Sequence, residues 1–271
     1  PRGTDARRGD RLAEATTRVD ATTIALAATT GGTTVSVVAR PRVVIVTTGD
    51  ELRDAGDPLD GPGDANRLRD GNGPMLRSTL ERLGAEVAWT KRVGDDLEAT
   101  RRAIEEGVDA ADLCITVGGV SAGALDLVPA AAAELGLEPV QRGVRVQPGR
   151  PLSWWSRNGR LGLVGLPGNP VSALVCAHLF VRPWIESTLG LDPASAWTPR
   201  ILSSTVATNR HRPACRPSRF SIDATGRALV EVATWSGSGD LPHLAGTHGI
   251  ARMPSGVTEV PEGTLVPTLD W

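Results

Sequence analysis

The chain has 271 residues, of which 40% are hydrophobic and 22% are charged, and its formal net charge is −2. These proportions are those of a globular protein long enough to bury its own core without disulfides or a structural metal. The near-neutral, mixed charge predicts neither a nucleic-acid-binding nor a membrane-binding surface, so an anionic ligand would need a local site.

The three cysteines, Cys114, Cys176 and Cys215, are far apart in the sequence. This spacing fits neither a zinc site nor a disulfide framework, and it is typical of a reducing compartment. No apolar stretch is long enough to span a membrane, and the polar, arginine-rich N-terminus contains no secretory signal. We therefore predict a cytoplasmic protein. Cys114 and Cys176 lie inside apolar runs, so we expect these two thiols to be buried.

Residues 1–41 form a lead-in that we interpret as the remnant of a larger domain. The segment 19–29 predicts a short helix that ends at Gly31 and Gly32. The segment 35–38 predicts a strand before Pro41.

Residues 42–190 alternate between strand and helix patterns. The predicted strands are 43–46, 86–90, 113–117 and 161–166. The predicted helices are 74–83, 97–106, 125–135 and 171–189. The apolar, β-branched run at 43–46 is typical of a strand covered on both faces. The alternation predicts an α/β fold with a doubly wound, mostly parallel sheet.

Residues 195–271 differ from the preceding part because prolines recur between short apolar alternations such as 228–232 and 264–266. This pattern predicts a small C-terminal β-domain, with a boundary near 191–199.

Four motifs follow predicted strands, and in a doubly wound sheet ligands bind at the carboxyl ends of the strands. The first is Thr47-Thr48-Gly49-Asp50-Glu51-Leu52. Its adjacent acids can coordinate magnesium or hold a polar ligand, or they can cap a following helix or turn.

The second motif runs from Val117 to Asp126 with the sequence VGGVSAGALD. Glycines between a buried strand and a helix can leave backbone N–H groups free to cradle a phosphate. A tight turn that needs positive φ would explain the same glycines.

The third and fourth motifs are Pro148-Gly149-Arg150-Pro151 and LPGNPVSA, residues 166–173. Arg150 offers a fork for an oxyanion, or it is a solvated surface arginine. Asn169 can cap the following helix with Pro170 in its first turn, which is compatible with anion binding at the helix N-terminus.

In this order, the segments resemble the molybdopterin molybdenumtransferase family, which includes the C-terminal domain of gephyrin. The resemblance also includes Asp70-Gly71-Asn72 and Gly94-Asp95-Asp96. It covers 42–190 motif by motif, extends into 191–271 through Ser236-Gly237-Ser238-Gly239-Asp240-Leu241, and is slight over 1–40.

The resemblance implies an enzyme that hydrolyses adenylated molybdopterin in a magnesium- and molybdate-dependent step and inserts molybdenum. It assigns three carboxylates to catalysis and the metal: Glu51, Asp95 and Asp126. It assigns to pterin binding Thr48, Gly49, Asp50, Asn72, Gly118, Gly119, Ser121, Gly123, Pro148, Gly149, Pro167, Gly168, Asn169 and Pro170. It assigns to molybdate Arg150, Ser172, Ser238 and Arg219.

Some positions depart from the family pattern. Gln147 and Gly143 stand where the family has basic residues, and Ala124 replaces a glutamate. A short insertion lies between Glu51 and Asp70. The family's long N-terminal portion, which supplies a dimerisation domain and a lid, is missing. We therefore expect a homodimer or a separate N-terminal polypeptide as partner. We also expect weak molybdenum insertion by the chain alone.

Three alternatives remain open from the sequence. The chain could be a molybdopterin adenylyltransferase, although that family usually lacks LPGNPVSA followed by a β-domain. It could instead be a non-catalytic molybdopterin-binding module or one half of a split enzyme. Tungstate could replace molybdate, because the two oxyanions are too alike for the sequence to separate.

Overall fold

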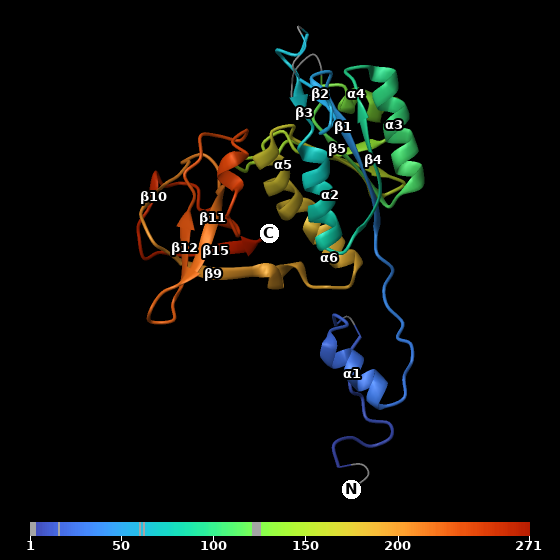
Figure 1. Ribbon diagram of the computed structural model, residues 1–271, viewed down its shortest axis with the longest axis vertical. Coiled ribbons are helices and arrows are strands. Elements are labelled where there is room, and N and C mark those ends of the chain that lie inside the picture. The colour runs from blue at the N-terminus through green and yellow to red at the C-terminus, as the bar shows by residue number, and fades with distance from the viewer. Residues whose placement is uncertain (1–3, 16, 60, 62, 121–125) are drawn as a thin grey trace.

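A six-stranded sheet organises the first part of the chain in the computed structural model (Figure 1), which describes residues 4–15, 17–59, 61, 63–120 and 126–271. The strand order is β4(Glu86–Val93), β1(Arg42–Thr48), β5(Leu113–Val117), β8(Arg160–Leu166), β7(Ser153–Arg157) and β6(Glu138–Arg142). The first four strands are parallel to one another, and β7 pairs antiparallel with both β8 and β6. The predicted mostly parallel sheet is therefore confirmed, but β6 and β7 were missed.

Helices cover both faces of the sheet. The helices are α2(Asn72–Arg82), α3(Leu97–Ala110), α4(Val128–Glu134), α5(Pro170–Cys176) and α6(Arg182–Thr188). Val43 and Ile45 pack with α2, α5 and α6, whereas Val44 and Val46 pack with α3 and α4. Successive side chains in a strand point to opposite faces, and helices cover both faces of this sheet. All four side chains of the run 43–46 are therefore fully buried.

Three helix predictions need correction. The helix predicted to end at residue 106 continues to Ala110, and Gly107 lies inside it, where a Cβ would be 2.7 Å from Cys114 Sγ and 3.0 Å from Val44 Cγ2. The glycine is needed for close packing of the helix on the sheet. The helix predicted at 171–189 is interrupted by a π-helical turn at Ala177–Val181. The predicted helix at 125–135 starts in the structure at Val128, and its residue 125 lies outside the described residues.

The N-terminal segment lies apart from the sheet (Figure 1). Helix α1(Ala21–Thr29) matches the prediction but has no buried residue. The strand predicted at 35–38 is wrong, since these residues are exposed and no described strand pairs with them. A β-branched run alone is insufficient, because a strand is stabilised by its cross-strand partners.

The C-terminal part is a closed barrel, which confirms the predicted β-domain. Its strands follow the order β11(Ala214–Ile222), β12(Ala228–Val232), β9(Trp197–Leu202), β15(Leu265–Asp270) and β13(Gly249–Met253). The smaller elements are the pairs β10(Val206–Ala207) with β14(Glu259–Val260) and β2(Leu52–Arg53) with β3(Leu68–Arg69), and the 3₁₀ turns η2(Pro193–Ala196) and η3(Pro242–Leu244).

A shared apolar cluster joins the sheet part to the barrel. Val171 and Val175 of α5 pack in it with Cys215, Ile250 and Leu269 of the barrel. This continuous packing holds the barrel loops at a fixed place beside the sheet. The division into 1–41, 42–190 and 195–271 as separate domains stays a prediction.

Cys114 and Cys176 are buried, as predicted, and Cys215 is buried as well. Burial raises the pKa of Cys114 and Cys215 to about 12, so both remain protonated near neutral pH. No helix in the described part of the chain is both long and apolar enough to cross a membrane.

His178, in the π-helical turn, should make stability depend on pH. Burial, Arg182 and Arg82 lower its pKa from 6.5 to about 3. Below pH 6.5 the unfolded chain gains a proton that the folded chain does not take up, so the free energy of unfolding falls as pH falls. The slope is up to about 1.4 kcal/mol per pH unit, which amounts to about 1.6 kcal/mol between pH 6.5 and 5.

Urea unfolding at pH 7, 6 and 5 measures this slope. His178→Leu should remove it, whereas the exposed His211→Gln should leave it unchanged. An equal slope in the His178→Leu variant would contradict the prediction.

Candidate ligand-binding cleft

A cleft of about 810 Å³ opens at the carboxyl ends of β1, β5 and β8. The structure brings together in its lining twelve of the residues predicted from the sequence. These are Thr48, Gly49, Glu51, Asn72, Asp95, Gly118, Gly119, Asp126, Pro167, Gly168, Asn169 and Pro170. Segments more than 100 residues apart in sequence therefore meet at one edge of the sheet, as the doubly wound topology requires.

Glycines form part of this lining because larger residues do not fit. Gly118 and Gly119 have φ values of +92° and +64°. A Cβ on Gly118 would lie 2.7 Å from Thr48 Oγ1 and 3.0 Å from the Thr48 carbonyl oxygen. Gly168, in the loop that follows β8, also lies close to this turn. A Cβ on Gly168 would lie 3.5 Å from Gly118 Cα. The turn thus lets two loops pass each other closely and leaves backbone exposed to the cleft.

Not every N–H of this turn can hold an anion. The Gly118 N–H donates to the Leu166 carbonyl at 3.0 Å, so it belongs to the sheet rather than to a phosphate cradle. The Gly119 carbonyl accepts from Val128 N–H at 3.2 Å, which fixes the start of α4. Ser121 and Gly123, which the sequence also predicted for this turn, lie outside the described residues.

Asp50 and Glu51 are adjacent but have different surroundings. Asp50 Oδ1 accepts from Asp95 N–H at 3.1 Å, and Asp95 Oδ2 accepts from Asp50 N–H at 3.4 Å. This reciprocal pair ties two loops together, and Asp50 does not line the cleft. Glu51 lines it, with its carboxylate folded over Gly49. Neither acid caps a helix, because the chain continues into a turn and then β2.

Asn72 lies at the start of α2 and links it to the 166–170 loop. Its Nδ2 donates to the Gly168 carbonyl at 2.6 Å. Its Oδ1 is buried and has no hydrogen-bond partner among the described residues. A buried acceptor without a partner is costly unless a ligand supplies a donor, so Asn72 Oδ1 is a candidate contact for a ligand in the cleft.

A loop of the barrel forms one side of the cleft. Asn169 precedes α5 but makes no side-chain capping bond; its Nδ2 instead donates to Ser238 Oγ at 2.8 Å. Val171 N–H donates to the Ser238 carbonyl at 3.1 Å, and Pro170 occupies the first turn of α5. Ser238 is therefore bound to the loop beside the cleft, and its neighbour Gly239 contributes to the lining.

The residues predicted for molybdate are not gathered in this lining. Ser238 contacts Asn169 as described, Arg150 is exposed, Ser172 is buried within α5, and Arg219 lies on β11 opposite Glu231. Pro148 and Gly149 are buried next to Arg150 and also lie outside the cleft lining.

Gln147 faces the barrel rather than the cleft. Its backbone N–H donates to the Pro213 carbonyl at 3.0 Å, and its carbonyl accepts from Cys215 N–H at 2.7 Å. Its side-chain Oε1 accepts from Asn209 Nδ2 at 3.0 Å. The structure thus gives Gln147 a role in holding the barrel.

Sequence reasoning assigned no role to eleven of the lining residues, and among them only Leu68 and Arg69 lie outside the motifs. The eleven are Thr47, Leu52, Leu68, Arg69, Asp70, Gly71, Val117, Val120, Pro151, Gly239 and Leu241. Asp70 was identified as part of a motif but was assigned no role; its Oδ1 accepts from Gly73 N–H at 2.9 Å. Arg69 gave no sequence signal, because it lies in the insertion between Glu51 and Asp70.

The described lining is strongly acidic. It carries four carboxylates, from Glu51, Asp70, Asp95 and Asp126, against one cationic side chain, Arg69. Among the described residues, no group of three His, Cys, Asp or Glu side chains is placed to hold a metal ion. The cleft therefore contains acidic ligands but no complete metal cage.

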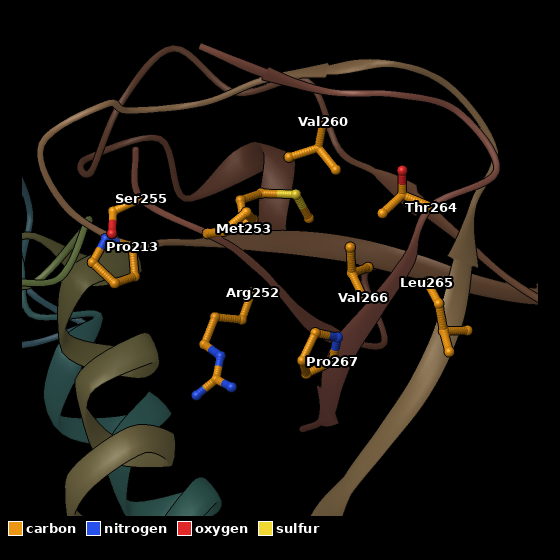
Figure 2. Close-up of a pocket in the computed structure, with 10 residues that line it drawn as sticks. Pro213, Arg252, Met253, Ser255, Val260, Thr264, Leu265, Val266 and Pro267 are labelled. Atoms are coloured by element: carbon orange, nitrogen blue, oxygen red, sulfur yellow. The ribbon is translucent and has the colours of Figure 1, made fainter. Parts of the chain in front are cut away.

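A second hollow of about 460 Å³ lies in the barrel (Figure 2). Apolar side chains such as Met253, Val260 and Val266 line much of it. None of the residues predicted for the site contributes to this hollow, so the cleft at the strand ends is the candidate functional site.

Comparisons with known proteins agree with the choice of this part of the chain. Residues 44–187 match a family model described as a probable molybdopterin binding domain. This range contains β1, β5 and β8 and the loops that form most of the cleft.

Two relatives are similar over almost the whole chain. Molybdopterin molybdenumtransferase 2 of Mycobacterium tuberculosis is 33% identical over 255 residues, which are 91% of this chain and 60% of that protein. Molybdopterin molybdenumtransferase of Bacillus subtilis is 30% identical over 272 residues, covering 98% of this chain and 61% of that protein. The chain thus spans about three fifths of the length of these relatives.

A solved structure shows the same arrangement of sheet and barrel. The molybdopterin biosynthesis MoeA protein of Pyrococcus horikoshii has a TM-score of 0.83 and 27% identity, covering 98% of this chain and 63% of that one.

Proposed function

The chain belongs to the molybdopterin-binding domain family, and from this premise we propose that it is a molybdopterin molybdenumtransferase, which binds molybdopterin in the cleft and inserts molybdenum into it. The substrate form that we propose is adenylated molybdopterin, with molybdate as the second substrate. Relatives matched over 91% and 98% of the chain carry the molybdenumtransferase name, so the adenylyltransferase alternative is not favoured.

The observation that carries this proposal is the meeting of the glycine turn with Asn72 Oδ1 at the strand ends. A ligand that rests on Gly118 and Gly119 approaches bare backbone, and Asn72, which also lines the cleft, has a buried side-chain oxygen that lacks a donor among the described residues. Molybdopterin carries both a phosphate and ring N–H donors, so it has groups for both features.

We propose that Glu51, Asp95 and Asp126 contact the adenylate side of the substrate through magnesium. Magnesium commonly binds one or two carboxylates together with substrate phosphates, and it keeps several waters. The acidic lining fits such a shared ion better than a resident one, because the described residues form no three-ligand cage. When bound, the ion would supply positive charge that offsets the phosphate charge.

The remaining roles follow from the contacts of the chain. Asn169 and Asn72 fix the loops on which the pterin rests, through their bonds to Ser238 and Gly168. We further propose that the protein works in the cytoplasm, and that a second copy or a separate polypeptide completes the site. For molybdate we propose the group Arg150, Ser172, Ser238 and Arg219, of which Ser238 is bonded to Asn169 of the cleft lining.

Two measurements test the proposal. Fluorescence titration of the full chain with molybdopterin should give saturable binding, and adenylated molybdopterin with magnesium and molybdate should yield AMP and metallated cofactor. Asn72→Ala should weaken molybdopterin binding about ten-fold, since loss of a hydrogen bond to a buried group costs about 1–3 kcal/mol. Asn66→Ala, at an exposed position, is the matched control.

Unchanged affinity in the Asn72→Ala variant would remove the cleft as the pterin site. Binding without AMP release, also when the family's N-terminal portion is added, would identify a non-catalytic molybdopterin-binding module instead.

A further inference from the structure

Three arginines from separate segments line a second pocket that adjoins the cleft. We call it the arginine pocket; it measures about 380 Å³. Its lining is Gly49, Asp50, Leu52, Arg53, Arg67, Arg92, Val93 and Gly94. Gly49 and Leu52 line both the arginine pocket and the cleft, so only the loop that follows β1 separates the two spaces.

Two of the guanidinium groups meet at one carbonyl oxygen. Arg53 Nη1 donates to the Asp50 carbonyl at 3.1 Å and to the Leu52 carbonyl at 2.6 Å. Arg67 Nη1 donates to the same Asp50 carbonyl. Because a neutral carbonyl offsets little positive charge, these two cations are held close together without a full counter-charge.

Arg92, at the end of β4, brings a third guanidinium and a donor without a partner. Its Nη2 lies 3.6 Å from the mostly exposed Asp54 carboxylate. Its Nη1 is buried and has no hydrogen-bond partner among the described residues. A buried charged donor without an acceptor is costly, so an acceptor from a ligand would stabilise this arrangement.

The charge balance favours an anion. Among the described lining residues there are three guanidiniums and one carboxylate, Asp50. One oxygen of Asp50 is already bonded to Asp95 N–H. The guanidinium charges in this pocket repel one another. A bound anion would attract each of them and offset that repulsion.

We propose that the arginine pocket binds a tetrahedral oxyanion, of the phosphate or molybdate type. Planar guanidinium forks match such oxygens, and the pocket lies directly behind the loop that carries Glu51. Arg53 and Arg67 belong to the insertion between Glu51 and Asp70, so two of the three guanidinium groups come from a segment outside the motifs of the cleft. The proposal does not depend on pterin binding.

Calorimetric titration of the full chain with inorganic phosphate, and separately with molybdate, at low salt tests this site. The unmodified chain should bind at least one of the two anions, and added salt should weaken binding. Arg67→Gln and Arg92→Gln should each raise the Kd about ten-fold or more, as expected for loss of a hydrogen bond between charged groups. Arg102→Gln, an exposed arginine on α3, should leave the Kd unchanged.

Comparison of the two anions identifies the source of the ligand. Tighter binding of phosphate would indicate a phosphate group of the substrate, and tighter binding of molybdate would indicate the incoming metal oxyanion. Either outcome supports the site if the arginine variants weaken binding of that anion. Arg67→Lys keeps the positive charge but loses the planar guanidinium. This variant should bind the anion with an affinity between those of the unmodified chain and Arg67→Gln. Circular dichroism checks that its fold is intact.

Absence of binding by either anion at low salt, or equal Kd values in the unmodified chain and both arginine variants, would overturn the proposal. No pterin is present in these titrations, so their outcome is separate from that of the molybdopterin test.

Discussion

Replacing Gly118 with alanine should abolish molybdopterin binding and destabilise the protein more than any other single methyl group added to the cleft. The residue has φ +92°, which costs an L-residue about 1–2 kcal/mol. The new Cβ would also lie 2.7 Å from Thr48 Oγ1 and 3.0 Å from the Thr48 carbonyl oxygen. The backbone oxygen cannot rotate away as a flexible side chain would, so the turn must shift.

The collision should add about 1–3 kcal/mol to the backbone cost. The displaced turn would move Gly119 and the start of α4, because Val128 N–H donates to the Gly119 carbonyl. We therefore expect a loss of about 2–5 kcal/mol in the free energy of unfolding and at least a hundred-fold loss of pterin affinity, the latter being worth about 2.7 kcal/mol or more.

Gly136→Ala provides the matched control. Gly136 also has positive φ, at +69°, but a Cβ there would have nothing within 4 Å. Urea unfolding of both variants separates the backbone cost from the collision, and fluorescence titration reports binding. Equal losses of the free energy of unfolding in Gly118→Ala and Gly136→Ala would show that the close approach of residue 118 to Thr48 contributes nothing to the destabilisation.

The sequence predicted the strands that carry the cleft because those strands are buried on both faces. The runs at 43–46 and 113–117 contain only residues that such strands prefer, and both are fully buried. Ser153–Arg157 was missed, since its two tryptophans lie between polar residues and it pairs antiparallel with both of its neighbours, β8 and β6. Antiparallel strands lack the continuous apolar run that marks a buried parallel strand.

The site could be predicted only as far as the positions of the loops. The topology places residues 47–52 and 117–120 at the same edge, so their convergence follows from the order of the motifs. Which of two neighbouring acids faces the cleft does not follow, because Asp50 is turned away by its bonds with the loop of Asp95. Tertiary hydrogen bonds decide side-chain direction, and a sequence motif does not contain them.

Replacing Glu51 with glutamine should change the affinity for adenylated molybdopterin in opposite directions with and without magnesium. Four carboxylates against one arginine line the described part of the cleft, so an anionic substrate meets net repulsion there. Without magnesium, removal of one negative charge should strengthen binding several-fold, since two charges about 4 Å apart near a protein surface interact by roughly 4 kcal/mol before screening.

With magnesium present, the same change should weaken binding about ten-fold or more, because the ion loses one of its few carboxylate ligands. Titrations of the unmodified chain and the Glu51→Gln variant, in EDTA and in millimolar magnesium, give the four dissociation constants needed. Glu105→Gln removes a carboxylate on α3 that pairs with Arg101, away from the cleft, and it should change neither condition.

The informative result is that Glu51→Gln changes the affinity in opposite directions in EDTA and in magnesium. A purely structural role for Glu51 would weaken binding in both conditions, and a site that needs no metal would show the gain in both. Only an ion shared between the cleft carboxylates and the substrate phosphates predicts a gain in EDTA and a loss in magnesium. A variant whose affinity moves in the same direction in both buffers would therefore refute the assignment of Glu51 to the metal.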